Sequence, residues 1–310
     1  MTRDDRTGGA PMTVSPATAV AVATAPAPAT APPAYPPLTI SFLRGDTPDP
    51  HCVEYPDRFY AKFTAPSRRD PRIGAYEDGC SILVTPPTFE AYWGSPASYW
   101  MRQKVRRAGR DGFVFAPIER DDYLDDIYAI NTSLPERQGR PMGDAYQQRP
   151  APQGPLPDFP CPRHALRQYG VLREGHLYAY AWVYVIGEMC LFSTILGHGE
   201  QMKSGIMSLL IVEAVRDLMA TAGLRYAMYN LHASGTDGLR FFKEQMGFHP
   251  YRVTWVMGDG TDEERQAARA RAIEETLRAG VQGAASGRPS MGAPTLRRIA
   301  HRMGRLIARS

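Results

Sequence analysis

The stretch from His176 to Val253 alternates short apolar segments with one long apolar run, and this pattern predicts most of the fold. Residues 176–185 (HLYAYAWVYV) alternate with a period of two, which is typical of a strand. Leu177 begins the aliphatic face and Tyr178 begins the aromatic face. Because neither face is polar, we expect helices on both sides of the sheet, or a groove lined by the aromatic face. Residues 189–196 are predicted to form the next strand.

A polar, glycine-bearing loop at 197–205 then leads into a helix over 206–222, which Gly223 ends as a C-cap. A strand at 224–231, a short helix at 238–246 and a last strand after residue 250 complete the pattern. This order predicts an α/β (α+β) domain. Free N–H groups at the start of the 206–222 helix can hold an anion such as a phosphate. The loop has neither the glycine spacing of a dinucleotide site nor that of a nucleotide P-loop.

The segment before residue 112 is punctuated by proline and glycine, and we expect it to form an irregular β-rich extension over 38–111, or a lid of loops. Strands are predicted at 38–43, 58–63 and 80–84. A basic helix over 95–108 begins with Ser95 as N-cap and Pro96 at the first helical position. Its positive charges form either a solvated face or a contact for a phosphate-bearing partner such as tRNA.

Residues 112–118 are predicted to form the first strand of the main domain, which we place at 112–258. A helix over 121–131 follows, with inward side chains at Leu124, Ile127, Tyr128 and Ile130. The polar loop 131–146 is either a surface loop without a functional role or a binding site for an anionic acceptor. Its candidate substrate-binding residues are Arg137, Gln138, Arg140 and Tyr146.

The two ends of the chain have a different composition. Residues 1–37 are rich in Ala, Pro and Thr, which predicts a disordered tail. Residues 259–310 are predicted to form a helical basic C-terminal tail that ends in an amphipathic helix at 295–310. We expect this helix to dock on an acidic protein surface or to contact an anionic membrane peripherally.

Composition narrows the class of protein. The net charge of +4 is too small to indicate nucleic-acid binding by itself, and no apolar run is long enough to span a membrane. The four cysteines, Cys52, Cys80, Cys161 and Cys190, are scattered without a C-x-x-C pair. We therefore expect reduced thiols, no metal site and a cytoplasmic location.

The region from Gly112 to Val253 resembles the GNAT superfamily of N-acyltransferases, whose loop of the form R/Q-x-x-G-x-G/A opens a helix that binds the pyrophosphate of acyl-CoA. Here the loop and helix start read QMKSGIMSLL (201–210), the following strand ends at Asn230, and Gly247-Phe248 closes the short helix. Two positions depart from the family pattern: Met207 replaces the second small residue, and Gln201 stands one residue early. The run LRFFKEQMG (239–247) also resembles the Fem-type aminoacyltransferases, which use aminoacyl-tRNA.

The resemblance implies a GNAT-like fold, with a mixed central sheet flanked by helices on both faces, and an enzyme that moves an acyl group, acetyl from acetyl-CoA, onto an amine acceptor. It implies a general base, for which we choose His232 over Glu188 and His198. It also implies an acid or a contact to the carrier, for which Tyr251, Tyr229 and Lys243 are the candidates. The implied contacts to the acyl-CoA co-substrate are Ser193, Thr194, Gln201, Lys203, Ser204, Gly205, Ile206, Met207, Asn230 and Lys243. Two alternatives stay open: a Fem-like aminoacyltransferase that uses aminoacyl-tRNA, and a non-catalytic interaction protein of this fold.

Overall fold

An eight-stranded mixed sheet is the centre of the computed structural model, which describes residues 35–45, 49–68, 70–161 and 163–258. The strands lie in the order β1-β10-β2-β9-β8-β7-β6-β3. Their bounds are β1 (Pro37–Leu43), β2 (Cys80–Val84), β3 (Val114–Pro117), β6 (His164–Arg173), β7 (His176–Ile186), β8 (Met189–Gly197), β9 (Tyr226–Leu231) and β10 (His249–Gly258). The β1–β10 and β8–β9 pairs are parallel and the others are antiparallel.

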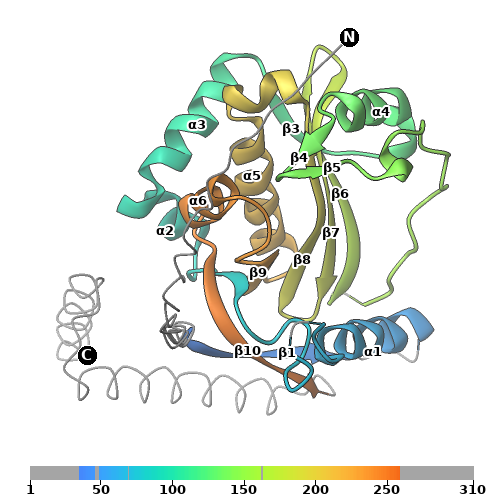
Figure 1. The fold of residues 1–310 in the computed structure, drawn as a ribbon, viewed down its shortest axis with the longest axis vertical. Coiled ribbons are helices and arrows are strands. Elements are labelled where there is room, and N and C mark those ends of the chain that lie inside the picture. The colour runs from blue at the N-terminus through green and yellow to red at the C-terminus, as the bar shows by residue number, and fades with distance from the viewer. Residues whose placement is uncertain (1–34, 46–48, 69, 162, 259–310) are drawn as a thin grey trace, which may run out of the picture. The chain divides into compact units, whose positions relative to one another are not determined.

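Helices cover both faces of this sheet, as the sequence predicts. Figure 1 shows α5 and α3 on one side of β6–β8 and α4 on the other. The helices are α1 (Pro50–Thr64), α2 (Phe89–Gly94), α3 (Tyr99–Arg110), α4 (Leu124–Thr132), α5 (Ile206–Thr221) and α6 (Asp237–Gln245). Short 3-10 turns lie at Pro96–Ser98 (η1), Arg120–Tyr123 (η2), Asp144–Tyr146 (η3) and Gly199–Ser204 (η4). The predicted α/β (α+β) class with a mixed, doubly covered sheet is confirmed.

β7 has two apolar faces because each meets a different layer. Ala181, Val183 and Val185 are buried in the cluster that includes α5, whereas Tyr180 packs with α4 residues. Leu177 joins the Tyr180 cluster and Tyr178 packs against the α5 cluster, so the faces predicted for these two residues are wrong. The reason is an irregularity in the β6–β7 pairing between Val171 and Leu172, which shifts the alternation at that end.

The prediction of a strand at 58–63 is wrong, because these residues belong to α1. Asp49 caps this helix by accepting a hydrogen bond from the His51 N–H at 2.8 Å, and Pro50 stands in its first turn. Phe59 and Phe63, four residues apart, both point into the core that β1 and β10 share. A spacing of four residues fits one face of a helix, whereas the apolar and polar alternation of residues 58–63 fits a strand equally well, so the sequence pattern alone does not decide between the two.

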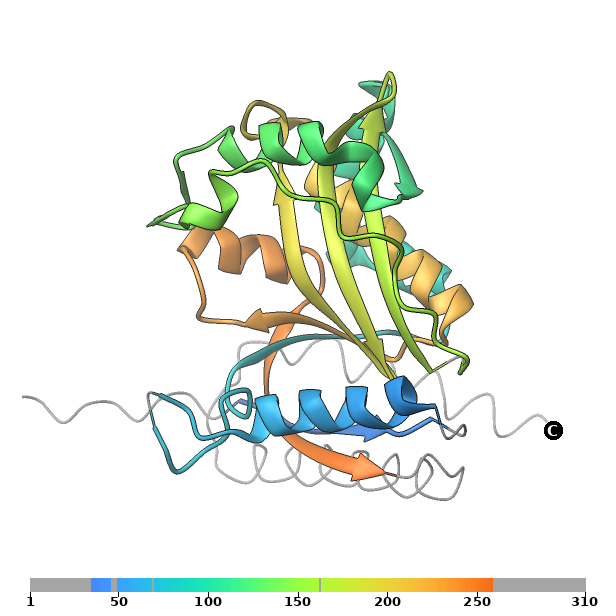
Figure 2. The same cartoon turned by 90° about the vertical axis from the view of Figure 1, so that its right-hand side faces the viewer.

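Part of the predicted extension is built into the central sheet. β2 pairs with β9 and β10, and β1 pairs with β10 along its whole length. Figure 2 shows α1 lying across β1 and β10 at one end of the molecule. Tyr128, predicted to point inward, is 37% exposed because it lies on the outer side of α4.

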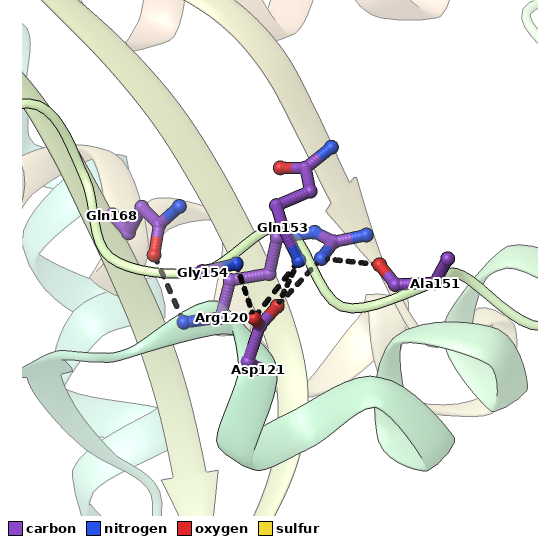
Figure 3. A network of polar contacts seen from close by, with 6 residues as sticks. All are labelled: Arg120, Asp121, Ala151, Gln153, Gly154 and Gln168. Carbon is purple, nitrogen blue, oxygen red and sulfur yellow. Dashed lines mark hydrogen bonds and ion pairs between the residues drawn. The ribbon is translucent and has the colours of Figure 1, made fainter.

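The proline-rich segment 147–161 runs along the sheet without helix or strand, and Asp121 anchors it (Figure 3). The Asp121 carboxylate accepts hydrogen bonds from the N–H groups of Gln153 and Gly154 at 2.9 and 2.8 Å. These bonds, with the neighbouring Arg120, hold the pKa of Asp121 below its ordinary value. Arg120 in turn donates to the Ala151 carbonyl at 2.9 Å.

The tails predicted at 1–37 and 259–310, apart from residues 35–37, lie outside the described residues. Of the helices in the described part of the chain, none combines the length and apolar character needed to cross a bilayer.

Candidate functional site

β8 and β9 leave the base of the sheet as a parallel pair and then separate (Figure 2). Their pairing covers only residues 189–191 of β8 and 226–228 of β9. On its other side β8 stays paired with β7, with a bulge at Ser193, between the pairs Val183–Phe192 and Trp182–Thr194. The second half of β8 therefore has one edge that β9 does not cover. In open α/β sheets, ligands bind outside the carboxyl ends of strands where neighbouring strands part.

A cavity of about 730 Å³ opens at this place. Its walls come from the end of β8, the start of α5, β9, α6, α3 and the β4–β5 hairpin (Glu136–Arg137 and Arg140–Pro141). A second hollow of about 170 Å³ shares Gln138, Ile195, Leu196, Tyr229 and Leu239 with it. Together they have the size and the mixture of apolar walls and few polar groups of a small-molecule site.

The N-terminus of α5 forms one end of the cavity. Gly205 caps the helix with a left-handed φ of +87°, and a Cβ on it would lie 2.3 Å from the Lys104 carbonyl oxygen. The backbone of α3 thus lies directly against the loop that opens α5. Met207 is buried and packs on Gly197, where a Cβ would lie 2.5 Å from the Met207 sulfur. The Met207 side chain therefore packs against Gly197 at the end of β8, where it fills space next to the loop that opens α5.

The β4–β5 hairpin covers the cavity from the other side. Gln138 and Gly139 both have positive φ, 55° and 73°, as a two-residue turn of this kind requires. A Cβ on Gly235, in the loop before α6, would lie 3.2 Å from the Gln138 side-chain oxygen, so the hairpin tip reaches that loop.

Arg137 fastens the hairpin to the sheet. Its guanidinium donates to the carbonyl of Gly197 at 2.9 Å and to that of Ile130 at 2.6 Å. Burial lowers its pKa, and its Nε has no hydrogen-bond partner among the described residues. Arg137 therefore brings a partly desolvated positive charge to the cavity wall.

The structure brings together one part of the predicted site. Residues predicted for the co-substrate that line the two hollows are Ser193, Thr194, Gly205, Met207 and Asn230, and those predicted for the acceptor are Arg137, Gln138 and Tyr146. Asn230 adopts a left-handed φ of 55°, and its side chain accepts from the Leu231 N–H at 2.7 Å.

Other predicted contacts lie outside the hollows. Gln201 accepts a hydrogen bond from the Ser204 hydroxyl at 3.2 Å inside η4, and the Ile206 side chain is completely buried. Lys203 is exposed on η4, Arg140 is exposed on β5, and Lys243 is buried beneath Leu231. None of these five, and not Ser204 either, is among the described residues that line either hollow.

The three predicted catalytic residues are not brought to the cavity. Glu188 lies at the opposite end of β8, where it accepts hydrogen bonds from Arg225 at 2.8 Å and from the Ser41 N–H at 3.4 Å. His232 faces Glu244 at 3.2 Å, and burial lowers its pKa. Tyr251 lies on β10 and packs, partly buried, against the core cluster that β1, β10 and α1 share. Glu188 and His232 each have a polar partner, and Tyr251 has apolar packing, away from the cavity.

Sequence reasoning missed Glu136, which is the one carboxylate among the described residues lining the larger hollow. It also gave little weight to Tyr229, whose pKa is raised by burial, so its hydroxyl keeps its proton at neutral pH. For Glu136 the sequence holds one local signal, Gly139 between two short polar segments, because glycine readily adopts the positive φ that a tight turn needs.

A Cys–His cluster lies away from the cavity. Cys52, Cys161 and His164 place one ligand atom each within 4.8 Å of one another. Cys52 and Cys161, which are far apart in the sequence, thus meet in the fold.

No protein-family model matches the chain, and no curated protein matches it. Similar solved structures include the C-terminal domain of a protein assigned as a lysylphosphatidylglycerol synthetase from Agrobacterium fabrum, with 14% identity and a TM-score of 0.37 over 56% of this chain and 58% of that one. L-PGS from Bacillus licheniformis has 13% identity and a TM-score of 0.37, over 64% and 65% of the two chains. A GCN5-related N-acetyltransferase from Kribbella flavida has 15% identity and a TM-score of 0.30, over 45% and 47%.

The chain therefore spans between about half and two thirds of these proteins, and the similarity concerns the fold alone. Structures that resemble this chain thus include GNAT-type acetyltransferases and lysylphosphatidylglycerol synthetases.

Proposed function

We propose that the protein is an acyltransferase that transfers an acyl group from an activated donor to an amine acceptor. The donor's acyl arm would lie between the separated strands β8 and β9. The observation that most supports this proposal is the parting of two parallel strands over a cavity of about 730 Å³. Such a gap exposes backbone N–H and C=O groups of β8 to an extended ligand.

The uncovered edge of β8 would act on the acyl carbonyl. When an amine attacks, the carbonyl oxygen becomes negatively charged, and fixed backbone N–H groups stabilise that charge. The bulge at Ser193 changes the direction of the strand next to the gap. We assign the oxyanion contact to the backbone of residues 193–195.

Proton transfer needs two further groups. Glu136 is the carboxylate on the cavity wall, and we assign it as the base that removes a proton from the attacking amine. Tyr229 lines the cavity and keeps its proton at neutral pH, and we assign it as the acid that would protonate the leaving group as the tetrahedral intermediate collapses. Arg137, Gln138 and Tyr146 would hold the acceptor.

Acyl-CoA, with acetyl-CoA as the simplest case, is the donor that we favour. Its pantetheine arm suits a cavity with mainly apolar walls, and its phosphates would meet Lys104 and the α5 N-terminus. A second candidate donor is aminoacyl-tRNA. The contact of the Lys104 carbonyl with Gly205 favours it, because this contact leaves little room for a pyrophosphate beside Gly205. The basic residues Arg106, Arg107 and Arg110 of α3 also favour a large polyanion.

The proposal is tested by the melting temperature of the purified chain with acetyl-CoA, with CoA and with an aminoacyl-tRNA. A ligand at a hundredfold excess over its dissociation constant stabilises the folded state by about 2.7 kcal/mol. The same series is run on Lys104→Glu, which changes the cavity wall, and on Arg110→Glu, which changes the same helix away from the cavity.

For acyl-CoA we expect a stabilisation that Lys104→Glu abolishes and Arg110→Glu retains. For aminoacyl-tRNA we expect both substitutions to weaken the stabilisation, and added salt to weaken it further, because phosphate contacts release counterions. If none of the three ligands stabilises the wild-type chain, the acyltransferase proposal is wrong, and a non-catalytic interaction protein becomes the better description.

A further inference from the structure

Three buried side chains, two of them close in the sequence and the third 109 residues before Cys161, meet where the start of α1 lies beside the start of β6. Cys52 lies in the first turn of α1, Cys161 ends the proline-rich segment, and His164 begins β6. The two sulfur atoms are 2.8 Å apart, and Cys161 Sγ is 3.0 Å from His164 Nδ1. Their exposed fractions are 0%, 4% and 2%. None of the three lines the hollows described above.

The protonation of His164 follows from its other contact. Its Nε2 is 2.8 Å from the Leu43 carbonyl oxygen, which can only accept a hydrogen bond, so Nε2 carries the proton. Nδ1 then presents a lone pair to Cys161. Burial lowers the pKa of His164, which keeps the ring neutral at neutral pH. A relay results in which the Cys52 thiol donates to Cys161 and the Cys161 thiol donates to His164.

The surroundings leave room for the pair only because residue 45 is glycine. A Cβ on Gly45 would lie 2.6 Å from the Cys52 Cβ and 3.1 Å from the Cys161 sulfur. The N–H of Gly45 also donates to the Cys52 carbonyl at 3.1 Å, which fixes the first turn of α1 beside the cluster. Backbone and side chains thus hold the two sulfurs together.

We propose that Cys52 and Cys161 are a reversible redox pair that closes to a disulfide, with His164 as the proton acceptor that activates Cys161. A bound metal ion fits the geometry less well. Two thiolates on one tetrahedral zinc, at about 2.3 Å each, would have sulfurs roughly 3.7 Å apart. The described residues also supply three ligand atoms here, not four.

A peroxide is the class of oxidant that suits a buried pair, because it is small. Cys161 passes its proton to His164 Nδ1, and the thiolate attacks one peroxide oxygen. This forms a sulfenic acid on Cys161 and a hydroxide ion, which takes up the proton as water. The Cys52 sulfur then attacks the Cys161 sulfur and forms the S–S bond, and the sulfenic oxygen leaves as a second water with the Cys52 proton. Two thiols are oxidised, and one peroxide is reduced to two waters.

The crosslink would join the start of α1 to the segment that leads into β6. The two cysteines are 109 residues apart, so the bond closes a long loop in the unfolded chain and stabilises the folded one. Burial raises the pKa of Cys161, so the thiol is its resting form and closure depends on His164.

The test is a peptide map of the full chain after treatment with hydrogen peroxide, compared with the same protein kept in dithiothreitol. We expect one linked peptide pair, Cys52 with Cys161, lighter by two hydrogen atoms, and its loss when dithiothreitol is added back. Cys80 and Cys190 are also buried and serve as internal controls, since they should remain free thiols. The oxidised chain should melt at a higher temperature than the reduced chain.

Variants distinguish the role of the cysteine pair, which forms the crosslink, from the role of His164, which accelerates it. Cys52→Ser should abolish both the crosslink and the rise in melting temperature, whereas Cys190→Ala should keep both. His164→Asn should slow closure at least tenfold and still give the same linked peptide. The proposal is overturned if wild-type protein treated with peroxide shows no linked pair. It is equally overturned if the purified chain holds one equivalent of zinc that protects both cysteines from peroxide.

Discussion

Lys243 belongs to the Fem-like run of residues 239–247, but it does not have the co-substrate contact that the resemblance implies. Its ammonium donates to the Leu231 carbonyl at 2.7 Å and to the Ser234 hydroxyl at 3.1 Å, and it lies over the Tyr229 ring. Its side chain is completely buried, and burial lowers its pKa to about 8. The lysine of the Fem-like run therefore ties the end of β9 to α6 and does not reach the cavity.

The lowered pKa predicts a pH dependence of stability. Between about pH 8 and the ordinary value of 10.5, the unfolded chain binds more protons at Lys243 than the folded chain does. The contribution of Lys243 to the free energy of unfolding should therefore rise across this window, by on the order of 1–3 kcal/mol. Urea unfolding of the wild-type protein and Lys243→Met at several pH values measures it. Lys203→Met, at an exposed lysine, should show no such trend, and a flat difference for Lys243→Met would contradict the argument.

At the scale of single residues, the sequence predicts the loop and strand-end positions better than the acid and base. Ser193, Gly205 and Asn230 follow from the order of elements, because each stands where a strand bulges or ends or a helix begins. Glu188 and His232 are polar residues near the same elements, but an ion pair and a hydrogen bond turn them elsewhere. The Cys52–Cys161 contact could not be predicted, since nothing local relates residues 109 apart.

At the scale of elements, the junction of α3 with α5 fixes one end of the cavity. Gly205 needs its left-handed φ, and any side chain there would strike the backbone of α3 at Lys104. Predicting α5 from sequence was possible because its apolar residues run from 206 to 218 and Gly223 marks its end. The close approach of α3 was not predictable, because a basic helix has no pattern that identifies its neighbour.

Gly205→Ala should destabilise the protein by at least about 1–2 kcal/mol, the cost of a left-handed conformation for alanine, with a further loss from the contact at Lys104. Gly109→Ala is the matched control, since this α3 glycine has open space around it and alanine favours a helix by up to about 1 kcal/mol. Chemical denaturation compares the two. A Gly205→Ala variant as stable as the Gly109→Ala variant would show that α3 does not press on this loop.

At the scale of the whole molecule, β10 links the two parts of the sheet. Its first three residues pair with β2, and the rest pairs with β1 under α1. Trp255 lies at the centre of this second part, with its ring 5.1 Å from Phe42 and 4.9 Å from Phe63, and its N–H donates to the Tyr76 carbonyl. The sequence indicates strands at β1, β2 and β10, but it does not predict that α1 packs on the β1–β10 part of the sheet. The reason is that part of α1, residues 58–63, alternates like a strand.

Trp255→Ala should lower the free energy of unfolding by about 3–5 kcal/mol, as expected for a buried tryptophan. Because β10 is shared, we expect hydrogen exchange to accelerate at β7 as well as at β1. Trp100→Ala, at a tryptophan that is 63% exposed, should change stability by less than about 0.5 kcal/mol. Faster exchange confined to β1 and α1 would show that the two parts of the sheet unfold independently.

The parallel pairing of β1 with β10 also constrains how the chain folds as it is made. Pro37 pairs with Arg252, and β1 has no other partner among the described strands. The ribosome therefore releases β1 and α1 long before their partner strand β10 is made. Until then the aromatic side chains of this segment lack the core residues that β10 contributes. During synthesis this segment is the part of the described chain that most needs protection by a chaperone, because its partner β10 is the last of the described strands to emerge.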